Sequence, residues 1–190
     1  PQRASDVVSL TLGAEFDNLN VVNGNTAWNR LGKLGNGGTT QVQMKAVTDI
    51  LKDHTKKHIE QLDGRNIAMV AHAVAKLNLK VDLMDALAER AQNPTVLPTL
   101  NAQGVANILW AFAKVGSLHV GLMEKLAETA MRPEVLLDCN AQGIANMAWS
   151  FATLGVSNVR FMETLARQAI QPDIISTVNS QGIANICWAF

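Results

Sequence analysis

The distribution of apolar positions predicts a chain built from paired helices. In the segment 101–116, apolar residues recur every three or four positions, which places them on one face of an α-helix. In the segment 120–131 they fall at i, i+1, i+4, i+5 and i+8, with charged residues on the opposite face. These two patterns predict two amphipathic helices in succession, here called helix A and helix B, joined by a short turn.

The same pair of patterns returns along the chain with a fixed period. The segment Asn-Ala-Gln-Gly-Val-Ala-Asn-Ile-Leu-Trp-Ala-Phe-Ala-Lys-Val-Gly at 101–116 recurs at 140–155 and begins again at 179–190. A related segment at 63–77 precedes them, with His72 in the place of tryptophan. A fixed period of 20–50 residues is typical of solenoids, whose units bury their apolar faces against one another. We therefore predict an all-α fold, an α-α superhelical solenoid of helix-turn-helix repeats of about 38–39 residues.

Local signals predict where each helix begins and ends. Residues suited to an N-cap precede every helix A, and the residues before each cap and at the fourth helical position are apolar, as in a hydrophobic staple. Gly116 and Gly155 follow the later A helices, and a proline follows each helix B. The expected units are about 62–100, 101–139, 140–178 and an incomplete 179–190. The expected caps are Asp63, Asn101, Asn140 and Asn179, and the prolines are Pro94, Pro133 and Pro172.

The first forty residues follow the repeat less closely. They are rich in Asn and Gly, but the segment 26–35 resembles the end of helix A, with Trp28 one position out of step. We interpret residues 1–40 as an irregular N-terminal segment that contains a degenerate capping unit, and residues 41–190 as the helical-repeat domain. Residues 41–61 are expected to form one helix. His54 and His58 lie four residues apart on it without a third ligand, so we predict a solvated helix face and no metal site.

Composition and charge narrow the functional classes only modestly. Sixteen basic residues balance sixteen acidic ones, and the balance is even along the chain, which disfavours strong non-specific binding of nucleic acid. Two cysteines at different phases of the repeat predict no disulfide. No segment is apolar enough to cross a membrane. The chain begins without methionine and stops inside a repeat, so we expect a longer protein whose targeting peptide is not visible.

Helix A is predicted to present a polar stripe opposite its apolar face. At 100° per residue, Gln103, Asn107 and Lys114 cluster on that side, and Trp110 lies at its edge. Stacked A helices would arrange these side chains as rows of amides and indoles. The predicted binding residues are Gln103, Asn107, Trp110, Lys114, Gln142, Asn146, Trp149, Gln181, Asn185 and Trp188.

Three interpretations of this stripe remain open at the level of sequence. The side chains could join neighbouring repeats, they could contact nucleic acid through amides and indoles, or they could bind an extended peptide by its main chain. In either binding interpretation, selectivity belongs to the positions that vary between repeats. The candidates for such readout are Lys76, Ala111, Ser150 and Thr153.

No catalytic arrangement is apparent in the sequence. There is no nucleophile beside a base, no paired carboxylates in a predicted pocket and no cluster of metal ligands. We therefore predict a protein that is not an enzyme and that requires no cofactor.

The helix A sequence resembles the octotricopeptide repeat family, which is related to repeats in RAP-domain and FAST-kinase-like proteins. The resemblance covers residues 62–190, and Trp-Ala-Phe-Ala-Lys-Val-Gly at 110–116 is its most specific part. It implies an organelle protein of the mitochondrial matrix or chloroplast stroma that binds single-stranded RNA in transcript maturation, stability, translation or ribosome assembly. The alternative is a scaffolding subunit of a large organelle assembly, such as a ribosome or a membrane complex, that binds protein through the same surfaces.

Overall fold

The chain forms a curved array of helices, and the predicted all-α fold is confirmed. The computed structural model describes residues 3–13, 20–35, 37–79 and 82–190, and no strand occurs among them. Residues 1–2, 14–19 and 36 of the predicted N-terminal segment lie outside this description. The division at residue 40 stays a prediction.

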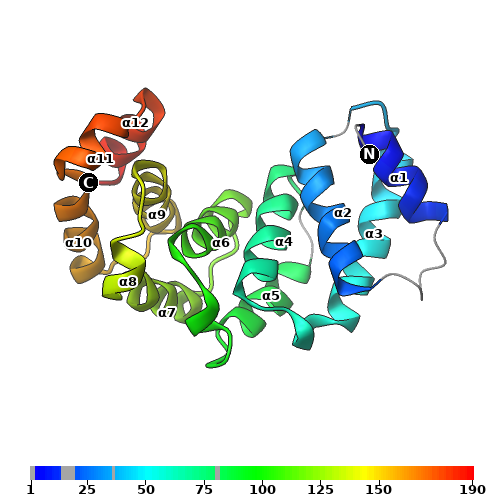
Figure 1. Cartoon of the computed structure of the whole chain (residues 1–190), viewed down its shortest axis with the longest axis horizontal. Helices are drawn as coiled ribbons and strands as arrows, with labels where there is room; N and C mark the ends of the chain where they lie inside the picture. Colours follow the sequence, from blue (N-terminus) through cyan, green and yellow to red (C-terminus); the bar gives the residue numbers. More distant parts are fainter. Residues whose placement is uncertain (1–2, 14–19, 36, 80–81) are drawn as a thin grey trace.

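Two sets of helices alternate along the array (Figure 1). The A helices follow the inner side of the curve, and each packs against the next, whereas the B helices lie on its outer side and make few contacts with one another. The A helices are α2 (Val21–Leu34), α4 (Gly64–Lys76), α6 (Ala102–Val115), α9 (Ala141–Leu154) and α12 (Ser180–Ala189). The B helices are α3 (Gln41–Lys57), α5 (Leu83–Ala91), α7 (Val120–Ala130) and α10 (Val159–Ala169).

The remaining elements are short or terminal. Helix α1 (Ala4–Gly13) packs against α2 and α3. Pro133 and Pro172 begin the short helices α8 (Pro133–Leu136) and α11 (Pro172–Thr177), as expected of proline at a first helical position. The 3-10 turns η2 (Ile59–Gln61) and η3 (Leu97–Thr99) precede α4 and α6.

The predicted N-caps of the A helices are confirmed. In α6, α9 and α12 the side-chain oxygen of the cap accepts a hydrogen bond from the N–H of a glycine three residues on, at 2.8–2.9 Å. Asp63 caps α4 in the same way, and Asn20 caps α2. A cap supplies a partner to one of the N–H groups that the first helical turn leaves unbonded.

The predicted turns after α6 and α9 are also confirmed. Gly116 and Gly155 adopt the left-handed conformation, with φ values of 71° and 65°. The N–H of the following residue then bonds a carbonyl of the last turn, Ser117 to Phe112 and Val156 to Phe151, which is the Schellman arrangement. Each turn thereby redirects the chain from helix A to helix B.

Small side chains bring successive A helices into close contact. The glycine at the third position of one helix packs against an alanine of the helix before it, as in Gly104 against Ala68 and Gly143 against Ala106. At the first junction a polar pair replaces this contact. Asn25 of α2, which is buried, donates a hydrogen bond of 2.9 Å to Asn66 of α4.

Two expectations about the first helices are corrected, and the one-position offset of Trp28 is confirmed. Helix α3 ends at Lys57 rather than at residue 61, and the 3-10 turn η2 follows it. His54 is 3% exposed, because its ring packs on Gly24 of α2 and on His58, so this helix face is not solvated. Trp28 is fully buried, with its indole N–H donating to Thr55. Counted from the caps, Trp28 occupies the inward position of Leu109, and Asn29 occupies that of Trp110.

Candidate binding face on the A helices

The A helices present the predicted polar stripe on the side turned away from the B helices. We call this surface the inner face. The glutamines Gln103, Gln142 and Gln181 are exposed at one end of it, and Lys76, Lys114 and Thr153 are exposed at the other. Asn107, Asn146 and Asn185 lie between them, half-buried. The packing of each A helix on the next arranges equivalent residues in rows across the helices.

The amides of this stripe have no partners among the described residues. No side-chain hydrogen bond joins Asn107, Asn146 and Asn185, and none is made by Gln103, Gln142 or Gln181, in the part of the chain that the structure describes. Each amide offers both donors and an acceptor. If the amides held the repeats together, they would bond one another or the neighbouring helix, as Asn25 bonds Asn66 at the first junction. The inner-face amides instead remain available to a ligand.

Indole rings form a second row. Trp110 is half-buried and lies against His72 of the preceding A helix, with ring centroids 5.1 Å apart. Trp149 is half-buried and Trp188 is 62% exposed. Burial, and secondarily the charge of Lys76, lowers the pKa of His72 below its ordinary value. The row therefore presents a largely neutral imidazole followed by three indoles.

Charge is segregated between the two sets of helices. The five A helices contain no acidic residue, although they carry five basic ones, whereas the four B helices carry seven acidic and eight basic residues. The five basic residues are Arg30, Lys33, Arg65, Lys76 and Lys114. Arg30 lies beside Val7 and Leu10 of α1, and the other four occupy positions of the polar stripe. The inner face is therefore cationic, although the charges of the whole chain sum to zero.

The cations of the A helices are also unpaired. None of the five forms an ion pair within the described residues, and all are exposed. On the B helices most cations have a partner, such as Lys56 with Asp82, Arg90 with Glu60, and Arg167 with Glu163. Lys125 and Arg160 of the B helices form no ion pair within the described residues. An unpaired cation on a surface without carboxylates raises the local concentration of anions. The even balance of charge along the sequence conceals this feature, which becomes visible only when the charges are assigned to the two sets of helices.

Two of the predicted readout residues are buried and cannot contact a ligand. Ala111 and Ser150 are each 0% exposed, and the Ser150 hydroxyl donates to the Asn146 carbonyl at 2.6 Å. Their position faces the preceding A helix, as the contact between Ala73 and Gly32 shows for the equivalent residue of α4. A helical wheel misses this contact because it assumes that a helix has one buried side. Each of these A helices is instead covered on three sides, by the preceding A helix, by the next A helix and by a helix B. Lys76 and Thr153 remain exposed candidates.

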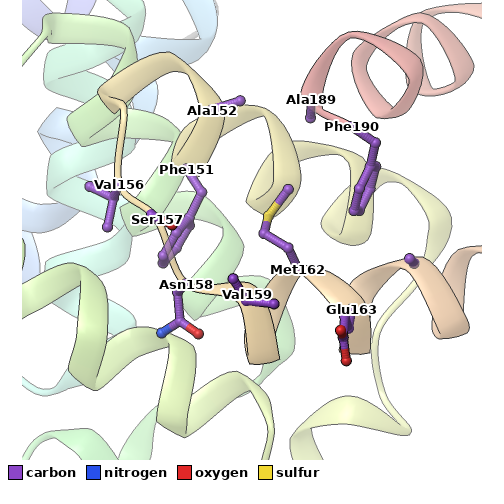
Figure 2. A pocket seen from close by; sticks show the side chains of 11 residues that line it. Phe151, Ala152, Val156, Ser157, Asn158, Val159, Met162, Glu163, Ala189 and Phe190 are labelled. Carbon is purple, nitrogen blue, oxygen red and sulfur yellow. The ribbon is translucent and has the colours of Figure 1, made fainter.

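A separate apolar hollow lies between α9, α10 and α12. Figure 2 shows Phe190 at the end of α12 and Met162 on α10 facing this hollow, with Val159 at its edge. Val159 is 68% exposed and Phe190 is 58% exposed. Phe112 and Phe151, the equivalent residues of the two preceding A helices, are instead buried, and Phe151 packs on Phe161 of the helix B that follows it. The exposure of Phe190 belongs to the last residue of the sequence and does not identify a contact site.

Other chemistry is not supported by the described residues. They contain no group of three or more His, Cys, Asp and Glu side chains able to hold a metal ion. No helix among them is long and apolar enough to span a membrane. Both cysteines are free, and burial raises the pKa of the Cys139 thiol to about 11, so that thiol stays protonated at neutral pH.

Comparison with known proteins places this arrangement in a family. No curated protein matches the chain. The family model described as RNA-editing substrate-binding complex 6 protein matches residues 34–190, a range that contains every A helix except α2 and all of the B helices. The resemblance to octotricopeptide repeats stays a prediction. Because the matched range covers most of the sequence, the chain belongs to the family of RNA-editing substrate-binding complex 6 proteins.

Proposed function

We propose that this chain is a non-enzymatic, RNA-binding subunit of an RNA-editing substrate-binding complex, and that its inner face holds single-stranded RNA. One observation carries the proposal. Within the described part of the chain, the A helices combine exposed cations that have no ion-pair partner with amides that have no hydrogen-bond partner, and they contain no carboxylate. The family description, which names an RNA-editing complex, supports the same proposal.

The chemistry of the inner face favours a single strand over a duplex. Lysine and arginine contact phosphates in either form, but amides and indoles reach the edges and faces of bases only where the bases are unstacked. A surface that offers both groups in rows matches a strand whose phosphates and bases are both accessible. The half-buried indoles provide flat apolar surfaces for stacking, which every base can use.

The cellular setting is part of the proposal. The resemblance of the repeats to octotricopeptide repeats supports an organelle, the mitochondrial matrix or the chloroplast stroma. There the protein would act on transcripts during their maturation, with editing as the process that the family description names.

The scaffolding alternative, in which the same surfaces bind protein, stays a prediction. The exposed Val159 and the half-buried Met162 lie beside Phe190, the last residue of the sequence, so the hollow does not identify a protein contact.

The proposal is tested by fluorescence anisotropy of a labelled 20-nucleotide RNA without secondary structure, titrated with the folded protein at several salt concentrations. We expect saturable binding that weakens as salt rises, and weaker binding of the same sequence as a duplex. Absence of binding at low salt by a protein shown to be folded would contradict the proposal. Capture of protein subunits by the same folded protein would then favour the scaffolding alternative.

A further inference from the structure

The rows of the inner face do not run its full length. Exposed lysines occupy the last turn of α2, α4 and α6, as Lys33, Lys76 and Lys114. Helix α9 carries no charged residue, and Thr153 takes the place of lysine on it. The cationic row therefore does not continue from α6 to α9.

The indole row occupies the other end of the inner face. It occupies α6, α9 and α12 as Trp110, Trp149 and Trp188. The equivalent positions of α2 and α4 hold Asn29 and His72. The cationic and indole rows overlap on one helix, α6, which carries both Lys114 and Trp110.

From this arrangement, and resting on the RNA-binding function proposed above, we propose that the inner face divides its ligand between two segments. The cationic segment, α2 to α6, holds phosphates, and the indole segment, α6 to α12, stacks unpaired bases beside the Asn146 and Asn185 amides. The ligand is a single strand that crosses the A helices in one orientation. Its bases must be unpaired at the end that lies on α9 and α12, and its backbone charge matters most at the other end.

Each segment has the physical means for its part. Neighbouring packed helices lie about 8–10 Å apart, so the three lysines form a row that spans about 16–20 Å and can contact successive parts of a backbone. Lysine is a flexible point charge suited to phosphate. On the other segment, α9 carries no charged residue, and stacking on indole is nearly independent of base identity.

The division predicts that affinity and salt dependence can be changed separately. In the anisotropy assay, Lys33→Gln/Lys76→Gln/Lys114→Gln removes three phosphate contacts. The slope of log K against log salt should become shallower by about 2, because each phosphate contact on a single strand contributes about 0.7 to it. Trp149→Leu/Trp188→Leu should leave that slope unchanged while weakening binding about 10- to 100-fold. Trp149→Phe/Trp188→Phe keeps aromatic rings and should recover most of the affinity.

An RNA with abasic nucleotides along one half tests the orientation. For the unchanged protein, abasic nucleotides in one half should weaken binding at least tenfold, and in the other half should have little effect. The Trp149→Leu/Trp188→Leu variant should lose this difference. The division is overturned if the leucine variant binds as well as the unchanged protein, if it flattens the salt slope as the lysine variant does, or if both abasic RNAs bind equally. Each of those results leaves RNA binding itself intact, whereas failure of the unchanged protein to bind any RNA overturns the proposed function instead.

Discussion

The A and B helices come from the same repeat, yet they differ in packing and in charge. Successive A helices pack closely through glycine and alanine and carry no carboxylates, and their cations form no ion pair with any residue that the structure describes. The B helices scarcely touch one another, and their acidic and basic residues are mixed. The A helices, here called the A layer, thus hold the repeats together and also carry the candidate binding surface. A total charge of zero conceals this difference.

The closest contact between A helices gives the largest expected effect on stability. A Cβ added at Gly32 would lie 2.9 Å from the Cα of Ala73, which belongs to a backbone that cannot turn aside. We expect Gly32→Ala to lower the free energy of unfolding by about 1–3 kcal/mol through overpacking, measured by urea denaturation.

A glycine of the B layer is the matched control. A Cβ at Gly121 of α7 would lie 3.1 Å from the side-chain oxygen of Gln92, the end of a flexible side chain. Gly121→Ala should therefore be neutral or stabilising, because alanine favours the helix. Equal destabilisation by both substitutions would contradict the claim that the A helices pack more closely on one another than the B helices do.

The first junction of the A layer can be converted into a later one. Asn25→Ala leaves the Asn66 amide without its partner and should destabilise the protein by about 1–3 kcal/mol. Asn25→Ala/Asn66→Gly recreates the alanine–glycine contact of Ala68 with Gly104, and should be more stable than the sum of the single effects predicts. Strict additivity in urea denaturation of the four proteins would show that the two junctions are not equivalent.

The caps of the A helices should each contribute a smaller amount. Asn140→Ala removes the acceptor for the Gly143 N–H and should cost about 1 kcal/mol in thermal or urea unfolding. Asn140→Ser keeps an oxygen at the cap and should cost little. A serine variant as unstable as the alanine variant would mean that the asparagine acts through another contact.

The smallest expected effect concerns pH. Because the pKa of His72 is lowered in the folded protein, the unfolded chain binds more protons there, and stability should fall as pH decreases through about 6.5 and below. His72→Trp introduces the residue that the later repeats have at this position and removes the imidazole that binds the proton. Thermal unfolding from pH 7.5 to pH 5 should show a smaller decrease in Tm for the variant. An equal decrease in both proteins would place the pH dependence elsewhere.

The regular parts of the fold could be predicted from the sequence because they repeat. Period, caps and turn glycines each specify local geometry, and the structure bears them out at Asn101, Asn140, Gly116 and Gly155. The errors occur where a helix meets neighbours that its own sequence does not reveal. Ser150, for example, is predicted to face a ligand but is buried, because the packing of α9 on α6 is not visible in the helical wheel of α9 alone.

The positions of the candidate binding residues could be predicted from the sequence, whereas the positive charge of the inner face was not predicted. The positions of the glutamines, asparagines and lysines on one exposed stripe follow from helical phase. Their lack of partners could not be predicted, because hydrogen bonding depends on the distances between helices. The segregation of charge, by contrast, was present in the sequence: no segment that forms an A helix contains Asp or Glu.

The central claim is that RNA binds the unpaired cations of the A layer, and the most direct test compares two variants of equal charge. Lys76→Gln/Lys114→Gln removes two cations from the inner face, and Lys125→Gln/Arg160→Gln removes two exposed cations from the B helices. Both are compared in anisotropy titrations of single-stranded RNA over a range of salt concentrations. The first variant should make the slope of log K against log salt shallower by about 1.4, because each lost phosphate contact contributes about 0.7, and the second should leave the slope unchanged. Equal slopes for both variants would contradict the account.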